Sequence, residues 1–267
     1  MARTYSRDVV LEALAARLGG AWLAQTQFAE LDSGEIPKTR AEAYLVADRM
    51  AEHIRDRLSG WKVGATSAVM RELDGHSDVI PGRIFRSVTW EGESFTLPTK
   101  MFPNARAEAE FAFRLNEDVT DAAINAPQQM AEIAVLHPAI ELIGNRFSAT
   151  GLTAEQNSLM TVADNGGGIG FVFGAPVENW RALEFQHYQV RVSLDGGAPS
   201  DNFLGDKRGT PLQALCDLGR HLAGRGYRLK TGDYVSTGAA CVPQAIGHGS
   251  HVLADFGALG KIEVSFE

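Results

Sequence analysis

Several features are scarce in this 267-residue chain, and each scarcity excludes a class of protein. Only two cysteines are present, Cys216 and Cys241, which excludes a disulfide framework or a cysteine-based zinc site and favours a reduced, cytoplasmic protein. No apolar run approaches the roughly 20 residues of a membrane helix. The N-terminal residues lack the apolar core of a signal peptide, so we expect no secretion signal.

Positive charge is scarce as well. Lysine and arginine total 25 against 33 acidic residues, the net charge is −8, and no block of basic residues stands out. We therefore expect neither nucleic acid nor a membrane as a partner. The seven histidines include no His-x-x-x-His pair of the kind that holds zinc on a helix. Among them, His76 in the loop His76-Ser77-Asp78 is the one that we retain as a candidate acid or base.

The segment 106–115 alternates between two kinds of side chain, which indicates a β-strand with two chemically different faces. Alanine, phenylalanine and leucine occupy one face, whereas Glu108 and Glu110 occupy the other, about 7 Å apart along the strand. Two carboxylates so close repel each other unless a cation or a shared proton lies between them. A hard divalent ion such as Mg²⁺ or Mn²⁺ is one explanation, and a polar face turned to water is the other.

A third acid strengthens the metal hypothesis. Glu141 lies in the apolar run 135–144, where an isolated carboxylate would be costly to bury without a cation, an arginine or a proton. Arg146 is a local candidate for that partner, so a structural ion pair is an alternative. Three inward acids from two strands would form an oxygen-ligand set with open positions for water and a chelating substrate.

Lys62 stands alone in a short apolar strand between Gly60 and Gly64. Burial and a neighbouring metal ion would both lower its pKa, and it could then move a proton or stabilise an enolate. A solvated surface lysine is the alternative. At another strand end, Thr237 and Gly238 could bind a carboxylate through hydroxyl and N–H donors, or form an ordinary turn.

The overall pattern predicts an α+β protein. Helices are expected over 8–30, 40–58 and 210–224, with a capping box from Thr39 to Glu42 and a C-terminal cap at Gly60. The remaining chain reads mainly as strands: 61–66, 88–92, 108–115, 140–143, 170–173, 188–194, 234–237 and 251–266. We therefore expect a small helical N-terminal region over 1–60 and a catalytic domain over 61–267.

Several dispersed motifs occur in an order that is familiar from one family. They are Gly60-Trp61-Lys62-Val63-Gly64, Ala107-Glu108-Ala109-Glu110-Phe111, Ala139-Ile140-Glu141, Ala163-Asp164-Asn165, Ser236-Thr237-Gly238 and Ala254-Asp255-Phe256-Gly257. Together they resemble the 2-keto-4-pentenoate hydratase and 4-oxalocrotonate decarboxylase branch of the fumarylacetoacetate hydrolase superfamily. The resemblance extends over roughly residues 8–267.

The resemblance implies a mixed β-roll core and a site that binds a small 2-oxo or 2-hydroxydienoate acid. It implies that Mg²⁺ or Mn²⁺ is held by Glu108, Glu110 and Glu141, with Lys62 beside the substrate. The positions that it implies for further substrate contacts are Thr66, Asp164, Asn165, Thr237 and Gly238. It also implies a homo-oligomer, in some cases associated with a related pathway enzyme, that acts in meta-cleavage degradation of aromatic compounds.

The loops around this site depart from the family pattern. The usual Pro-Asp-Phe-Gly after the lysine strand is replaced by a loop in which His76 and Asp78 are the candidate acid–base residues. The usual Ala-Asp-Asn-Ala-Ser loses its hydroxyl, and Gly247-His248-Gly249 replaces the usual Gly-Asp turn.

These changes leave the reaction open. The main expectation is hydration of a 2-hydroxy-2,4-dienoate to a 4-hydroxy-2-oxo acid. Decarboxylation of a 4-oxalocrotonate-type acid, C–C hydrolysis of an acylpyruvate with His76 and Glu72, and a non-catalytic partner subunit are the alternatives.

Overall fold

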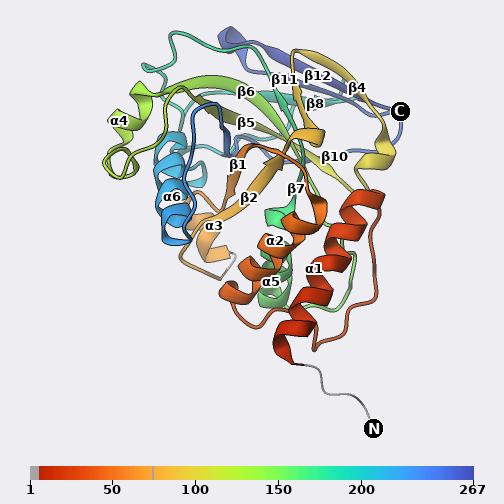
Figure 1. Ribbon diagram of the computed structural model, residues 1–267. Coiled ribbons are helices and arrows are strands. Elements are labelled where there is room, and N and C mark those ends of the chain that lie inside the picture. The colour runs from red at the N-terminus through yellow and green to blue at the C-terminus, as the bar shows by residue number, and fades with distance from the viewer. Residues whose placement is uncertain (1–5, 74) are drawn as a thin grey trace.

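The computed structural model describes residues 6–73 and 75–267, and it has the expected α+β composition (Figure 1). Helices α1 and α2 precede the first strand, and α5 packs beside α2 below the main sheet, whereas α6 and α4 lie at another side of it. The helices are α1 (Arg7–Ala24), α2 (Arg40–Ile54), α3 (Ala68–Leu73), α4 (Pro127–Glu132), α5 (Ala154–Ala163) and α6 (Pro211–Gly224). No helix in this described part of the chain is long and apolar enough to cross a membrane.

Two sheets form the centre of the molecule. The larger, strongly curved sheet has the order β2-β1-β9-β5-β6-β7-β3, with the short β10 paired to β5, and the smaller sheet has the order β4-β12-β11-β8 (Figure 1). The strands of the larger sheet are β1 (Leu58–Gly64), β2 (Ile80–Phe85), β3 (Thr89–Glu91), β5 (Arg106–Leu115), β6 (Ala134–Ile143), β7 (Gly168–Phe173), β9 (Tyr234–Ala239) and β10 (Gln244–Ala245). Those of the smaller sheet are β4 (Ser94–Leu97), β8 (Arg191–Leu194), β11 (His251–Asp255) and β12 (Lys261–Phe266).

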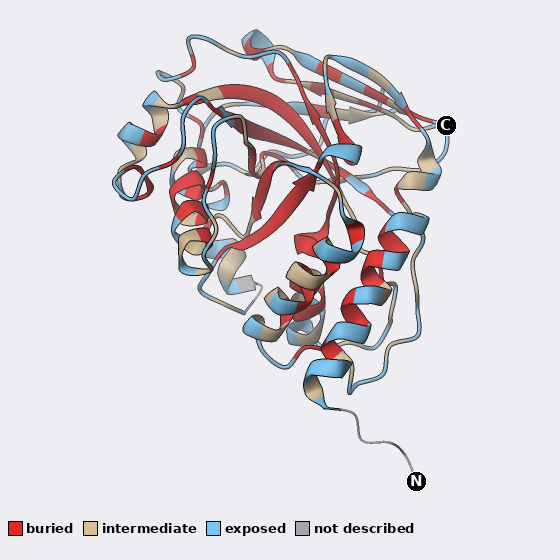
Figure 2. Cartoon of the chain, viewed as in Figure 1, coloured by how far each residue is buried: buried red, intermediate tan, exposed pale blue. Residues whose placement is uncertain are grey.

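Strand β5 lies at the centre of the larger sheet, and its two faces lie in different environments, one in the hydrophobic core and one carrying the acidic side chains. Its residues Ala109, Phe111 and Phe113 are buried in the main hydrophobic core, as the alternation predicts, so Glu108 and Glu110 face the other way. Figure 2 shows that β1, β2, β5 and β6 are largely buried, whereas the helices are buried on one side only. Strand β5 is flanked on both sides, by β6 and β9, and therefore cannot be a solvated edge.

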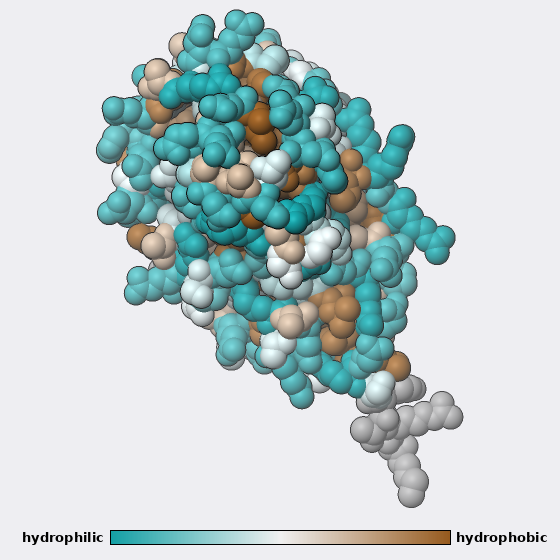
Figure 3. Space-filling view, turned by 60° about the vertical axis from the view of Figure 1, so that its left-hand side comes forward, coloured by the Kyte–Doolittle hydropathy of each residue, from teal (hydrophilic) through white to brown (hydrophobic). Residues whose placement is uncertain are grey.

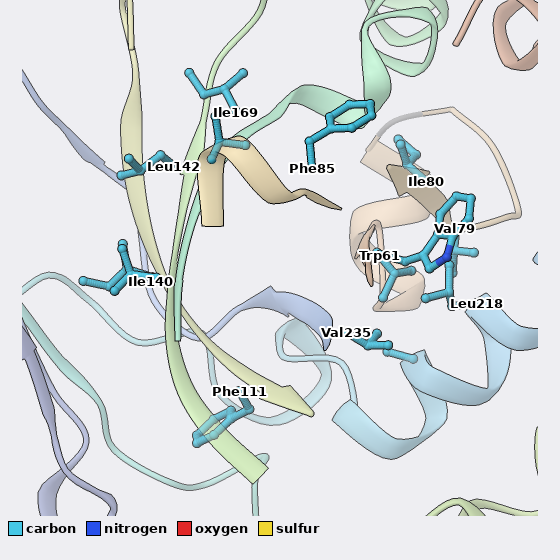
Figure 4. Packing of buried hydrophobic residues seen from close by; sticks show 14 of the residues in the cluster. Trp61, Val79, Ile80, Phe85, Phe111, Ile140, Leu142, Ile169, Leu218 and Val235 are labelled. Atoms are coloured by element: carbon cyan, nitrogen blue, oxygen red, sulfur yellow. The ribbon is translucent and has the colours of Figure 1, made fainter. Parts of the chain in front are cut away.

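Helix α6 closes one side of the core. Its strong periodicity places Leu215, Leu218 and Leu222 on a buried face. Figure 4 shows Leu218 of α6 beside Trp61 of β1 and Val235 of β9, which belong to the same cluster. Helix α6 therefore packs against one face of β1 and β9, and Lys62 and Ser236 lie on the opposite face of these two strands. The face of the molecule in Figure 3 is mainly hydrophilic, with small apolar patches separated by polar side chains.

Several predicted boundaries were wrong. Helix α1 ends at Ala24 and α2 at Ile54, because Gln25 and Arg55 adopt left-handed backbone conformations that stop each helix. Gly60 lies inside β1 and caps no helix. The Thr39 hydroxyl accepts the Glu42 N–H as a capping box requires, but the Glu42 carboxylate binds Arg7 and the N–H of Lys38.

The sequence analysis also missed whole elements. It did not predict β2, β4, α3, α4 or α5, and it predicted only the last four residues of β6. The reason for β2 is clear, since Ile80-Pro81-Gly82 is typical of a loop and Pro81 is tolerated only because β2 is an edge strand. Helix α5 is short and is held by a capping box between Thr153 and Gln156.

Candidate metal and substrate site

Three carboxylates meet where β5 and β6 run side by side. Glu108 pairs directly with Glu141 across the two antiparallel strands, and Glu110 follows two residues along on the same face. One oxygen from each of the three side chains can be chosen so that all lie within 4.8 Å of one another. The three acids that the sequence analysis named as candidate metal ligands therefore lie together.

The cluster concentrates negative charge in a protected place. Glu110 and Glu141 are each 1% exposed, and Glu108 is half-buried. Burial, together with the charge of Glu110, raises the pKa of Glu108 to about 8, and burial raises the pKa of Glu141 well above its usual range. Arg146, suggested above as the partner of Glu141, lies elsewhere: its backbone N–H binds Asp164, and its guanidinium binds the Met101 carbonyl. That suggestion was wrong.

Glu110 is oriented by a bulge in β9. The pairing of β5 with β9 shifts by one residue between Glu110 and Ala112, and Gly238 at the bulge has a φ of +99°. This geometry lets the Ser236 hydroxyl and the Gly238 N–H both donate to the same Glu110 oxygen, at 2.5 and 2.8 Å. Sequence analysis missed Ser236. Two signals were available: Ser236 belongs to the motif Ser236-Thr237-Gly238, and its period-two relation to Gly238 places both residues on one side of the strand.

Lys62 is the cation that faces the cluster. Its Nζ lies 3.3 Å from a Glu141 oxygen and donates to the Gly166 carbonyl at 3.0 Å, and the residue is 6% exposed. Burial lowers the pKa of Lys62, but the charges of Glu141, Glu108 and Glu110 raise it by more. The net direction is upward, opposite to the one expected from the sequence. Burial of the side chain was anticipated, but the three acids dominate its electrostatics.

The donor set fits a hard divalent cation. The Glu141 Oε1 atom is buried, with Lys62 Nζ 3.3 Å away, and makes no hydrogen bond within the described residues, so it keeps a lone-pair direction for a further partner. Gly168 keeps this region open, because a Cβ at that position would lie 2.8 Å from Glu141 Oε1. Three carboxylate oxygens with no nitrogen or sulfur donor are the ligands that Mg²⁺ and Mn²⁺ prefer.

A cavity of about 700 Å³ opens over these residues. Lys62, Glu108 and Glu110 line it, and the remaining wall comes from several separate segments. Gln27, from the connection between α1 and α2, is part of that wall, and its side chain donates to the Asn145 carbonyl at 2.7 Å. The further lining residues that carry polar or charged side chains are Thr66, Asn104, Arg106, Asn145, Ser148, Thr161 and Lys207.

Curated proteins with similar sequences are hydratases and decarboxylases by name. The chain is 25% identical over 211 residues to a 2-keto-4-pentenoate hydratase of Paraburkholderia xenovorans, covering 79% of this chain and 77% of that one. It is 27% identical over 223 residues to a 4-oxalocrotonate decarboxylase of a Pseudomonas species, covering 83% and 82%. The predicted resemblance to this branch is confirmed. No family model matches the chain.

Solved structures share the fold of this chain. The 4-oxalocrotonate decarboxylase of Pseudomonas putida G7, complexed with magnesium and adipate, superposes with a TM-score of 0.84 at 20% identity over all of both chains. Fumarylpyruvate hydrolase of Pseudomonas aeruginosa, complexed with Mn²⁺ and pyruvate, gives 0.53 at 14% identity, covering 79% of this chain and 89% of the other. The fold predicted from the resemblance is therefore confirmed.

Of the five residues predicted to contact the substrate, two line the cavity and three do not. Thr66 and Gly238 line the cavity. The Thr237 hydroxyl donates to the Phe111 carbonyl at 2.5 Å, and Thr237 is not among the lining residues. The Asn165 amide pairs with both backbone groups of Arg83, at 2.7 and 2.8 Å, and so links the loop before β7 to the edge strand β2. Asn165 thereby places Gly166, whose carbonyl holds Lys62.

Asp164 is likewise turned away from the cavity. It is 1% exposed, and one of its oxygens accepts the Arg146 N–H. Burial raises its pKa to about 7, which the Arg146 N–H and guanidinium only partly counteract. The side chains of Asp164 and Asn165 thus shape the turn that follows α5, and the cavity receives Gly166 and Gly167 from this motif.

The structure does not bring the candidate acid–base residues to the cluster. Asp78 is exposed and pairs with His221 of α6 at 2.8 Å, and neither it nor His76 lines the cavity above Glu108. His76 instead borders a separate pocket with Lys38, at the start of α2. The sequence suggested these residues because they replace a family motif, and a replacement in sequence does not guarantee the same position in space.

Proposed function

We propose that this chain is a divalent-metal-dependent lyase that hydrates a 2-hydroxy-2,4-dienoate to a 4-hydroxy-2-oxo acid. The observation that carries the proposal is the cluster of Glu108, Glu110 and Glu141 with Lys62 at the wall of a 700 Å³ cavity. The curated relatives named as hydratases supply the reaction class. The pathway would be meta-cleavage degradation of aromatic compounds.

Glu108, Glu110 and Glu141 would hold Mg²⁺ or Mn²⁺. When bound, such an ion would supply a positive charge that stabilises the enolate form of a 2-oxo acid. The protein's own contribution is orientation. Ser236 and the Gly238 N–H fix one oxygen of Glu110 and leave its second oxygen free to act as a ligand.

Lys62 would act at the substrate's C2 oxygen. Its Nζ is held between the Gly166 carbonyl and Glu141, so its third N–H direction remains for a substrate atom. A lysine that stays protonated beside three carboxylates stabilises developing negative charge on that oxygen. The substrate's C5 gains a proton, the C2 hydroxyl loses one, and water then adds at C4 of the resulting enone.

Decarboxylation of a 4-oxalocrotonate-type acid is the second candidate, and the decarboxylase relative at 27% identity favours it. Both reactions need the same enolate at the same residues. The acylpyruvate hydrolase alternative required His76 and Glu72 near the substrate, and His76 lies at a different pocket. A non-catalytic partner subunit would have no use for a buried lysine aimed at three acids.

The test is a stopped reaction with Mg²⁺ or Mn²⁺ whose products are identified by NMR. The two substrates are 2-hydroxypenta-2,4-dienoate and 2-oxohex-3-enedioate. Formation of a 4-hydroxy-2-oxo acid supports hydration, whereas CO₂ release from the diacid supports the second candidate. Turnover of neither, with Mn²⁺ still stabilising the protein, would contradict both.

A lysine variant tests the assignment within the site. Lys62→Met should lower kcat by about a hundredfold or more, as expected for loss of a charge that stabilises a transition state, while Mn²⁺ still raises the melting temperature. Lys100→Met is the matched control, because Lys100 is exposed and does not line the cavity. Full activity of Lys62→Met would refute its role.

Three broader features belong to the same proposal. We infer a cytoplasmic enzyme, which the two buried free cysteines support, and a homo-oligomer, alone or with a related pathway enzyme. We also infer an N-terminal helical region over 1–60 and a catalytic domain over 61–267, with Gln27 of the first region serving the site of the second.

A further inference from the structure

Two cations besides Lys62 line the cavity and form no ion pair with another described residue. Besides Lys62, the positively charged lining residues are Arg106 and Lys207, and both are exposed toward the cavity side. Within residues 6–73 and 75–267, neither side chain makes an ion pair or a hydrogen bond. The acids that line the cavity are Glu108 and Glu110, which belong to the carboxylate cluster. The charge of Arg106 lowers the pKa of Glu108, but neither Arg106 nor Lys207 has a carboxylate within ion-pair distance among the described residues, so both can receive an anionic group.

Arg106 is built into the same strand as the carboxylate cluster. It lies two residues before Glu108 on β5 and therefore points to the same side of the sheet. Its backbone pairs with Ile143 of β6 on one side and Ala245 of β10 on the other, which fixes the direction of its side chain. Two residues along a strand advance about 7 Å.

Lys207 reaches the cavity from a short turn, Gly205–Lys207, that is tied down by the next residue. Arg208 is 3% exposed, and its guanidinium donates to the Phe185 carbonyl at 2.7 Å, the Asn202 side chain at 2.9 Å and the Ala240 carbonyl at 2.5 Å. Ala240 directly follows β9, which carries Ser236 and Gly238. Arg208 thus anchors Lys207 to the strand that orients Glu110.

We propose that Arg106 and Lys207 determine substrate choice by binding a second carboxylate at the far end of the substrate. The inference rests on the part of the proposed function that places the C1 carboxylate and C2 oxygen at the glutamate cluster. It narrows the substrate, for hydration or for decarboxylation, to an acid with a second carboxylate, which 2-hydroxypenta-2,4-dienoate lacks. An extended six-carbon chain spans about 6 Å, because each of its five C–C bonds of about 1.5 Å advances about 1.25 Å along the zigzag. This span is close to the step from Glu108 to Arg106 along β5. A second carboxylate at the end of such a chain could form charged hydrogen bonds with Arg106 and Lys207, whereas an apolar tail could not.

The experiment compares the diacid 2-oxohex-3-enedioate with the monoacid 2-hydroxypenta-2,4-dienoate in the metal-loaded enzyme, with kcat and KM measured for each. The wild type should favour the diacid in kcat/KM. Arg106→Gln and Lys207→Met should each lower the ratio of the two kcat/KM values by about tenfold, mainly through KM for the diacid. Arg106→Lys and Lys207→Arg should retain most of the preference.

Two variants control for general loss of surface charge. Lys100→Met and Arg191→Gln remove exposed cations that do not line the cavity, and the ratio should not change. A ratio that stays constant in Arg106→Gln and Lys207→Met would overturn the proposal, as would a wild type that favours the monoacid.

Binding separates this proposal from the proposed reaction. Adipate and hexanoate differ only in the second carboxylate, and neither needs turnover to bind. In the presence of Mn²⁺, adipate should raise the melting temperature more than hexanoate, and Arg106→Gln and Lys207→Met should abolish the difference. If neither substrate is turned over but adipate still stabilises the protein more than hexanoate does, recognition of the second carboxylate stands and the proposed reaction is wrong. Equal stabilisation by the two acids would overturn tail recognition itself.

Discussion

Asp164 offers a sharp test of the electrostatics behind the cavity. Its carboxyl group is buried at the end of α5, where one oxygen accepts the Arg146 N–H and the other, Oδ1, has no hydrogen-bond partner among the described residues. Burial raises its pKa from the ordinary 3.8 to about 7. The folded protein therefore holds Asp164 protonated at pH values where the unfolded chain has it ionised.

The sign and size of the effect follow from this difference. A carboxyl group whose pKa is raised by folding contributes most to the free energy of unfolding below its unfolded pKa, near pH 4. The contribution is lost as the pH rises through about 7. The rise from 3.8 to about 7 corresponds to about 4 kcal/mol over the whole range. Between pH 5 and pH 8 the loss is about 3 kcal/mol.

Asp164→Asn removes the titration and preserves the shape. The asparagine oxygen can still accept the Arg146 N–H, although its NH₂ group lies where Asp164 Oδ1 has no partner and costs about 1 kcal/mol at every pH. The stability of the variant relative to the wild type should therefore improve by about 3 kcal/mol from pH 5 to pH 8. Subtracting the two curves cancels the other titrating groups, which both proteins share.

The assay is urea unfolding of both proteins at pH 5, 6, 7 and 8 without divalent metal. Asp32→Asn, at an exposed position, is the control and should follow the wild type in parallel. A difference between wild type and Asp164→Asn that stays constant to about 0.5 kcal/mol across this range would refute the assignment of a raised pKa to Asp164.

Further variants probe the metal ligands and the loop anchor. Glu108→Ala should remove the stabilisation by Mn²⁺. For the wild type, that stabilisation is about 2.7 kcal/mol when Mn²⁺ is present at a hundredfold excess over Kd. The control Glu117→Ala, at an exposed position, should keep it, and stabilisation of Glu108→Ala by Mn²⁺ would disprove the ligand assignment. Ser236→Ala, which takes one donor from Glu110, should weaken Mn²⁺ affinity by about tenfold in a calorimetric titration, and unchanged affinity would show that the bulge alone orients the ligand. Arg208→Met should lower the free energy of unfolding by about 3 kcal/mol, because several buried acceptors lose their donor; a loss below about 1 kcal/mol would mean that the turn is held otherwise.

The carboxylate cluster could be predicted because it depends on short-range geometry. Period-two alternation places Glu108 and Glu110 on one face, and an isolated acid in an apolar run predicts that Glu141 has a partner. The identity of that partner depended on a long-range contact. Arg146 is five residues away in sequence and Lys62 is far from it, yet Lys62 is the one beside Glu141. Sequence distance was the wrong guide.

The residues around the substrate could not be placed in the same way. Ser236 reaches Glu110 only because a bulge at Gly238 shifts the pairing of β9 by one residue. Asn165 was predicted to touch the substrate, but its amide replaces a missing strand contact at the edge of β2. Neither a bulge nor an edge closure leaves a pattern in a single sequence that would distinguish it from an ordinary turn.

Arg106 marks the limit of what alternation could have revealed. It shares the period-two face of Glu108, so its direction was available from the sequence, but its meaning was not. An arginine two residues before a glutamate suggests a salt bridge between them. In the structure the charge of Arg106 does lower the pKa of Glu108, but Arg106 forms no ion pair among the described residues and lines the cavity with Lys207. Lys207 comes from a turn 101 residues later whose position depends on the buried Arg208. The carboxylate cluster is thus encoded in two paired strands, whereas the proposed substrate selection requires contacts that only the folded chain assembles.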